Sequence, residues 1–220
     1  EVGAWSNPLD SDPAQRQAAM DKCIASLRLA DALGARCCVN VAGARGPRWA
    51  GPHRDNLSRE TFTLIVRSVQ EIIDSAKPTQ SCYALETMPW IYPDSTKSYA
   101  ELVDAIDRTA FGVHLGPVYM INCPERYFHN GDLIREFVTV LGSEIRSVHV
   151  KDILLHNKLT VHLDEVAPGE GGLELAVLLH ELMGLDPDLP IMLEHLPTDA
   201  AYNQAAAHVR GVAAAEGIQL

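Results

Sequence analysis

The chain has 220 residues, of which 47% are hydrophobic and 21% charged, a composition typical of a folded globular domain. Its 18 basic and 29 acidic side chains give a formal net charge of −11, which argues against binding to nucleic-acid phosphates. No apolar run is long enough to span a membrane, and no basic-then-apolar leader opens the chain, so we expect neither a membrane span nor an intact secretory signal. The five cysteines are odd in number and lack CxxC spacing, which favours a reduced, cytoplasmic protein.

Helical and strand patterns alternate along the chain. The first helix is predicted between Asp12, which can cap it, and Gly34, which suits its end. Its predicted inner face consists of Met20, Ile24, Leu27 and Leu33. Later helices are predicted at residues 58–76, 99–106, 133–141, 173–183 and 199–215. Short β-rich apolar runs predict strands at residues 37–41, 82–85, 111–115, 147–150 and 191–193, and residues 1–5 would finish a further strand.

This alternation indicates a parallel sheet, because neighbouring parallel strands need a crossover helix between them. Glycines cluster at residues 43–46 and 169–172, but neither cluster has the GxGxxG spacing of a dinucleotide-binding turn. No Walker phosphate loop is present either, so nucleotide binding is not expected. No linker composition interrupts the chain, and we predict a single α/β domain over residues 1–220. The pattern alone leaves an open doubly wound sheet and a closed barrel as alternatives.

Polar side chains gather where the predicted strands end. Glu86 and Glu194 each follow a strand directly, while His149 and Lys151 stand two apart and therefore face the same side. Ligands of parallel α/β folds bind beyond the carboxyl ends of the strands. Carboxylates and imidazoles that meet there suit Mn²⁺, Mg²⁺, Co²⁺, Fe²⁺ or Zn²⁺. The alternative for each residue is structural: a glutamate in an ion pair, or a buried histidine with its hydrogen bonds satisfied.

Four segments in chain order resemble one known family. They read LETMPW at 85–90, VHLGPV at 113–118, SVHVKD at 147–152 and MLEHL at 192–196. Together they resemble the sugar phosphate isomerase/epimerase family, which has the xylose-isomerase-like TIM barrel, and residues 168–171 resemble its loop between the last two strands. The resemblance implies a (β/α)8 TIM-barrel type that is incomplete at the N-terminus. It would hold about six βα units and lack the first two.

The same resemblance implies a divalent metal held by two glutamates, an aspartate and a histidine. Glu86 and Glu194 match the glutamates, and His149 matches the histidine. Gly116 stands where the aspartate is expected. Three residues further on, where family members usually carry Asn or His, this chain has Tyr119. The site is therefore expected to lack one protein ligand.

Five further residues are interpreted as neighbours of the metal or of the substrate. His114 faces the same way as position 116 and is a possible substitute ligand, with a water molecule as the alternative. The candidates for substrate contact are His114, Lys151, Tyr119, Trp90 and Glu170. The competing readings are an ion pair for Lys151, packing for Trp90 and a solvated loop position for Glu170.

The resemblance implies a metal-dependent isomerase or epimerase of a sugar or sugar derivative. Such an enzyme removes a proton next to a carbonyl and passes through an enediolate, with Glu86 and Glu194 as proton carriers. One alternative is a lyase or dehydratase of the same superfamily, inositol-type or C-glycoside-cleaving; another is a non-catalytic binding member, suggested by Gly116. We expect a small carbohydrate as partner, with neither nucleic acid nor membrane. A homo-oligomer or another partner is expected to cover exposed strand edges.

Overall fold

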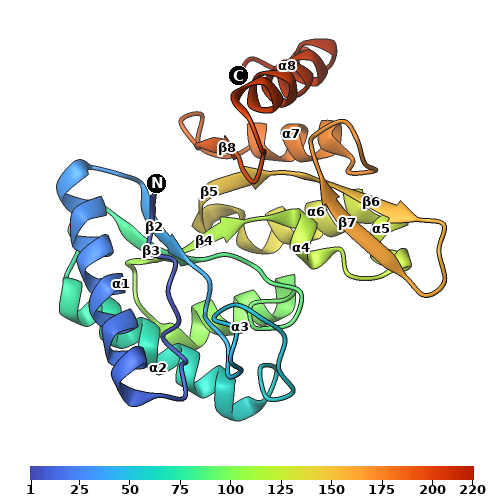
Figure 1. Cartoon of the computed structure of the whole chain (residues 1–220). Helices are drawn as coiled ribbons and strands as arrows, with labels where there is room; N and C mark the ends of the chain where they lie inside the picture. Colours follow the sequence, from blue (N-terminus) through green and yellow to red (C-terminus); the bar gives the residue numbers. More distant parts are fainter. The chain divides into compact units, whose positions relative to one another are not determined.

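The computed structural model describes all residues, 1–220, and the chain forms two compact units (Figure 1). Unit 1 comprises residues 1–115 and 144–147, and unit 2 comprises residues 116–143 and 148–220. Strand β5 (Ile145–Val150) belongs to both, because its first half lies in unit 1 and its second half in unit 2.

The strands are parallel and follow the predicted βα pattern. In unit 1, hydrogen-bonded neighbours run from β1 (Val2–Gly3) through β2 (Cys37–Asn40) and β3 (Cys82–Leu85) to β4 (Phe111–Leu115). In unit 2, the second half of β5 pairs in parallel with β8 (Ile191–Leu193). Each of these six strands is followed by at least one helix before the next. The prediction of about six βα units of the TIM-barrel type is confirmed.

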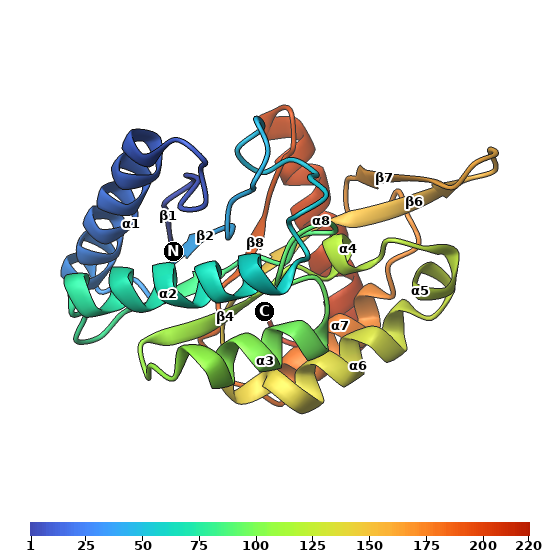
Figure 2. The same cartoon turned by 90° about the horizontal axis from the view of Figure 1, so that it is seen from below.

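Three long helices belong to unit 1: α1 (Pro13–Leu33), α2 (Arg59–Ala76) and α3 (Thr96–Ile106) (Figure 2). Helix α1 starts and ends as predicted, because the Asp12 side chain accepts two backbone N–H bonds of the first turn and Gly34 takes a left-handed conformation with φ 68°. Its inner face was predicted wrongly in part, since Leu33 is exposed and Ile24 only half-buried. The buried residues are Ala19, Met20, Cys23, Leu27 and Ala30, so small side chains replace the larger ones in the contact face.

Unit 2 contains the helices α4 (Pro117–Met120), α5 (Pro124–Phe128), α6 (Asn130–Leu141), α7 (Leu175–Met183) and α8 (Asp199–Ala215). Between β5 and α7 the chain also forms an antiparallel hairpin of β6 (Asp152–His156) and β7 (His162–Val166). The sequence did not predict this hairpin, because β7 is mostly solvent-exposed and has no apolar run. Strand β7 carries Glu165, which contributes to the candidate site.

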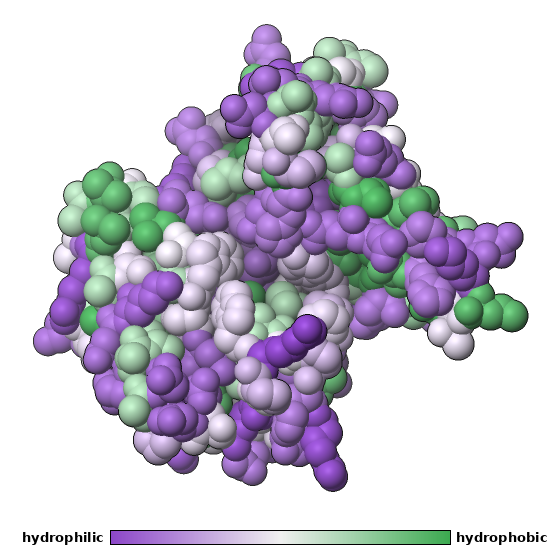
Figure 3. Space-filling view, in the orientation of Figure 1, coloured by the Kyte–Doolittle hydropathy of each residue, from purple (hydrophilic) through white to green (hydrophobic).

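The surface and the core agree with the composition. Hydrophilic residues cover much of the face seen in Figure 3, as expected for a chain of net charge −11. No helix combines the length and the apolar character that crossing a bilayer requires. All five cysteines are free, and Cys37 and Cys82 pack with Val39 and Ala84 in a buried cluster of unit 1. Cys37 and Cys38 are both fully buried, which indicates that these side chains pack in the core.

Candidate metal and substrate site

Strand β5 positions the first two residues of the site. His149 is the second-last residue of β5, and Lys151 directly follows the strand. Because side chains alternate along a strand, both face the side opposite to Val148 and Val150. Both side chains are buried, with residue exposures of 3% for His149 and 2% for Lys151. A buried ammonium group requires counter-charges, since its isolated burial would cost several kcal/mol or more. The surrounding side chains of unit 2 provide them.

Glu194 is the first of these counter-charges. In the register between β5 and β8, His149 pairs with Met192 and Val150 with Leu193, so Glu194 follows β8 at the level of Lys151. One oxygen of its carboxylate, Oε2, lies 3.0 Å from His149 Nδ1 and 2.5 Å from Lys151 Nζ. The structure therefore brings together three of the predicted site residues within unit 2, around a single carboxylate oxygen.

These contacts control the ionisation of Glu194. Burial alone would raise the pKa of this carboxyl group, because burial penalises the charged form. His149 and Lys151 more than offset burial, through their contacts and their charge, and lower the pKa to about 2. Glu194 is consequently a carboxylate at neutral pH, the form that can ligate a metal or accept a proton.

Tyr119 and Glu165 complete the surroundings of Lys151. The ammonium Nζ lies 4.0 Å from the centre of the Tyr119 ring, a cation–π contact, and 3.9 Å from Glu165 Oε2. Tyr119 belongs to α4, Glu165 belongs to β7 and Glu194 follows β8, so three parts of unit 2 contact one ammonium group. Tyr119, one of the predicted substrate residues, thus packs its ring against the ammonium group of Lys151.

His195 is a further member of this cluster. Its Nδ1 lies 2.8 Å from Glu165 Oε1 and 3.3 Å from the Tyr119 hydroxyl, and its Nε2 lies 3.5 Å from Glu194 Oε1. Its backbone has φ 60°, an uncommon conformation for a residue other than glycine. His195 and Glu165 were missing from the predicted site. The signal for His195 was its place directly after Glu194, whereas Glu165 required knowledge of the hairpin.

Asp152 fastens the neighbouring loop. Its side chain is buried, and its two oxygens accept four backbone N–H bonds of 2.8–3.1 Å, from Ile153, Gly169, Gly171 and Leu173. A Cβ atom on Gly171 would lie 2.3 Å from the Ile153 carbonyl oxygen, so only glycine fits there. The predicted substrate residue Glu170 sits in this loop and is exposed.

The remaining predicted site residues belong to unit 1. Glu86 follows β3 directly and is 4% exposed, and its backbone N–H donates to the Asn40 carbonyl oxygen at 2.9 Å. Trp90 is partly exposed, and its indole N–H donates to the Ala50 carbonyl oxygen at 2.8 Å. This bond connects Trp90 to the loop that contains Ala50 in unit 1.

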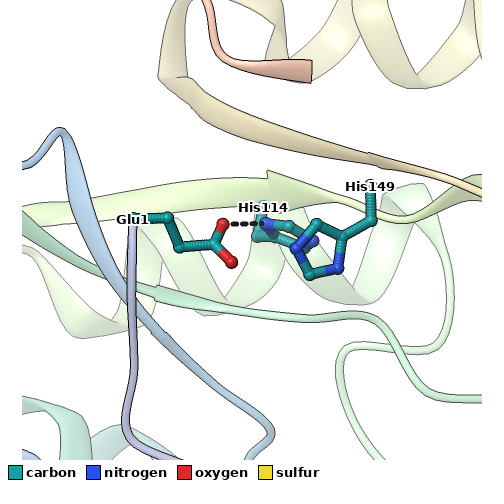
Figure 4. Close-up of side chains that lie close together, drawn as sticks. All are labelled: Glu1, His114 and His149. Atoms are coloured by element: carbon teal, nitrogen blue, oxygen red, sulfur yellow. Dashed lines mark ion pairs between the residues drawn. The ribbon is translucent and has the colours of Figure 1, made fainter. Parts of the chain in front are cut away.

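His114 lies within β4 and is fully buried. Its Nδ1 lies 2.6 Å from the Ser147 hydroxyl and 3.6 Å from Glu1 Oε2, the ion pair drawn in Figure 4. The Ser147 hydroxyl also accepts a bond from the Cys37 thiol at 3.2 Å, and burial raises the pKa of that thiol to about 11. Because Nδ1 is committed to Ser147, ligation of a metal by His114 would have to use Nε2.

The donor set of unit 2 fits a divalent cation. Two ligand atoms at about 2.1 Å from one ion, separated by angles near 90–110°, lie about 3.0–3.4 Å apart. The 3.0 Å between His149 Nδ1 and Glu194 Oε2 falls in that range. Imidazole with carboxylate is a usual combination for Zn²⁺, Fe²⁺ and Mn²⁺. Gly116 offers no side-chain ligand and forms the N-cap of α4.

The family follows from a direct comparison. A family model described as xylose isomerase-like TIM barrel matches residues 3–212. The chain belongs to this family. In this xylose isomerase-like chain, Glu86, Lys151 and Glu194 each directly follow a strand.

Solved structures share the fold of this family member at low sequence identity. A xylose isomerase-like TIM barrel protein from Mycobacterium smegmatis in complex with magnesium is 12% identical, with 93% of this chain and 70% of that chain covered and a TM-score of 0.70. An L-ribulose 3-epimerase is 14% identical, with coverages of 98% and 72% and a TM-score of 0.68. A probable 3-DHS dehydratase from Bacillus anthracis is 17% identical, with coverages of 94% and 73% and a TM-score of 0.69. A search of the curated proteins finds no match.

Proposed function

We propose that this chain is a metal-dependent isomerase or epimerase of a sugar or sugar derivative. The observation that carries the proposal is the contact between His149 and Glu194 at the carboxyl ends of two paired parallel strands. That is the end of the strands at which enzymes of TIM-barrel type place their chemistry. Family membership supports the same reading, as does the similarity of the fold to an L-ribulose 3-epimerase.

The ligands of the metal would be Glu86, His149 and Glu194. Glu86 follows β3 as Glu194 follows β8, so each lies at the carboxyl end of a strand with a parallel neighbour. A divalent ion supplies Lewis-acid stabilisation of negative charge on substrate oxygens when it is bound. A magnesium complex of a protein with the same fold supports a divalent cation here. Because residue 116 is glycine, a water molecule or His114 would take the place of the family's aspartate.

The two glutamates would move the proton. A carboxylate that is ionised at neutral pH can remove a proton from the carbon next to a carbonyl, and a second carboxylate can return it from the other side. Glu194 meets the first requirement, because its neighbours hold its pKa at about 2. We assign Glu86 and Glu194 these two roles, with an enediolate between the two steps. Lys151 keeps Glu194 in place and its ammonium can neutralise a substrate oxygen.

Metal content and isotope exchange test the proposal. The purified full chain is loaded with Mn²⁺, its bound metal is quantified, and it is incubated in D₂O with a panel of ketoses and aldoses. We expect about one ion per chain and deuterium at the carbon next to the carbonyl. Glu194→Gln should lose at least tenfold in both measurements, whereas Glu136→Gln, an exposed glutamate on α6, should match the wild type. Bound metal without exchange on any sugar would contradict the isomerase assignment.

The variant Gly116→Asp addresses the missing ligand. If the vacancy weakens the site, the aspartate should raise metal affinity at least tenfold, because it adds a charged ligand. Equal affinity in both proteins would mean that position 116 is not needed for binding.

A dehydratase is the second candidate function. It is favoured by the similarity of the fold to a probable 3-DHS dehydratase and by the shared first step, removal of a proton next to a carbonyl. The two reactions differ in outcome, since elimination produces a conjugated carbonyl compound that absorbs ultraviolet light. Deuterium exchange without such absorbance supports the isomerase, and absorbance that grows with time supports the dehydratase. A binding member without catalysis would show neither.

A further inference from the structure

We propose that Lys151 competes with the divalent cation for Glu194, and that Glu165 is the partner to which Lys151 transfers when the cation binds. This inference rests on the proposed metal-dependent function and adds to it a residue that controls metal affinity. It is drawn entirely from side chains of unit 2.

The competition arises at one atom. Glu194 Oε2, the oxygen placed 3.0 Å from His149 Nδ1 and so suited to share an ion with it, is also the oxygen that Lys151 Nζ contacts at 2.5 Å. A divalent cation at that oxygen would stand beside the ammonium group, and like charges at such separation repel strongly in a poorly hydrated site. The ion pair of Lys151 with Glu194 Oε2 and the binding of a cation to the same oxygen therefore weaken each other.

Lys151 cannot resolve this conflict by turning to water. The residue is 2% exposed, and its ammonium already lies over the Tyr119 ring at 4.0 Å. Leaving all carboxylates would strand a buried charge, which costs several kcal/mol. The ammonium must therefore keep one acidic partner in every state of the site.

Glu165 provides that second partner. Its Oε2 lies 3.9 Å from Lys151 Nζ, just beyond hydrogen-bond length. Its other oxygen, Oε1, is held at 2.8 Å by His195 Nδ1, which fixes the carboxylate with Oε2 turned to the lysine. A displacement of about 1 Å would shorten this ion pair to hydrogen-bond length. The site thus has two arrangements: Lys151 on Glu194 without the ion, and Lys151 on Glu165 with it.

A double-mutant cycle on metal affinity tests the transfer. The metal-stripped full chain is titrated with Mn²⁺ by calorimetry in four forms: wild type, Lys151→Met, Glu165→Gln and the double variant. We expect Lys151→Met to bind Mn²⁺ at least tenfold more tightly, because the competing charge is gone. Glu165→Gln should bind at least threefold more weakly, because the carboxylate to which Lys151 would transfer is gone. In the Lys151→Met background, Glu165→Gln should change affinity by less than twofold.

The outcomes separate this inference from the proposed function. Unchanged or weaker Mn²⁺ binding by Lys151→Met overturns the competition. An equal loss from Glu165→Gln in both backgrounds shows a plain charge effect and overturns the transfer, while the metal site itself stands. Absence of Mn²⁺ binding in all four proteins contradicts the proposed function and this inference together. Circular dichroism checks the fold, and Lys151→Gln serves as the second variant if Lys151→Met does not fold.

Discussion

Replacing Asp152 by alanine removes a buried carboxylate on which one loop of unit 2 depends. The two oxygens of Asp152 accept the backbone N–H groups of Ile153, Gly169, Gly171 and Leu173 at 2.8–3.1 Å. Three of these donors lie in the loop before α7, so the substitution detaches that loop from the start of β6 while leaving both strands of the hairpin intact.

The expected loss of stability follows from these four bonds. A hydrogen bond to a charged group contributes about 1.5–3 kcal/mol, so four independent bonds would give about 6–12 kcal/mol. They share one carboxylate, however, and Gly169 and Gly171 are exposed, so water can replace part of what their N–H groups lose. We therefore expect Asp152→Ala to lower the free energy of unfolding by about 4 kcal/mol. Asp152→Asn, which keeps one acceptor oxygen, should lose about half as much.

Urea unfolding followed by circular dichroism measures this loss, and amide hydrogen exchange locates it. Exchange at Gly169, Gly171 and Leu173 should accelerate at least a hundredfold in Asp152→Ala. The matched control is Asp164→Ala on β7, an exposed aspartate whose Oδ2 lies 2.8 Å from His156 Nε2. An exposed ion pair of this kind contributes less than about 1 kcal/mol.

Two results would refute the reasoning. A loss below about 1 kcal/mol in Asp152→Ala, with the urea dependence unchanged, would mean that the four bonds contribute little net stability. Preserved exchange protection of the loop amides would mean that other contacts hold the loop. The side chain of Asn130 is the specific competitor, because it donates to the Gly172 carbonyl oxygen at 2.9 Å and accepts the Glu174 N–H at 2.8 Å.

Three further changes have predictable directions. Gly171→Ala should lower the free energy of unfolding by more than about 2 kcal/mol, since its Cβ would lie 2.3 Å from a backbone oxygen. Gly211→Ala in α8, where a Cβ would have nothing within 4 Å, should raise the free energy of unfolding by about 0.5–1 kcal/mol. Urea titrations of both variants measure these changes. The ionised Glu194 stabilises the fold above its ordinary pKa of 4.5 and loses this effect as the pH falls to its folded pKa of about 2, so the advantage of wild type over Glu194→Gln should shrink from pH 4.5 down to about pH 2 in unfolding titrations. Tyr99→Phe should cost about 2 kcal/mol in thermal unfolding, because the buried hydroxyl bonds the Leu85 carbonyl at 2.5 Å and the backbone N–H of His114 at 3.1 Å.

The βα pattern could be predicted because buried parallel strands are continuous apolar runs, and amphipathic helices repeat every three to four residues. The same logic failed where burial is partial. Strand β7 has only exposed and half-buried positions, and the adjacent Asp164 and Glu165 are both exposed, so its sequence has no strand signal. In α1, Ala30 is buried and Leu33 exposed, which side-chain size alone could not indicate.

The part of the candidate site that lies at the ends of strands could be predicted from the sequence. His149, Lys151 and Glu194 followed from their places at strand ends, and the structure brings these three together. The partners of Lys151 could not be predicted in the same way. Tyr119 comes from a short helix and Glu165 from the hairpin, and only the folded unit shows that both approach one ammonium group.

The alternation along β5 has a consequence for how this strand can change. Ser147, His149 and Lys151 occupy every second position, and Val148 and Val150 occupy the positions between them. In a strand without a bulge, deleting or inserting a single residue would exchange the two sets, so that Lys151 would take the place of a buried valine and a valine would enter the polar site. A single-residue insertion in β5 would therefore need a β-bulge to keep both sets in place, whereas an insertion of two residues would not. The loops on either side of β5 have no such restriction on their length.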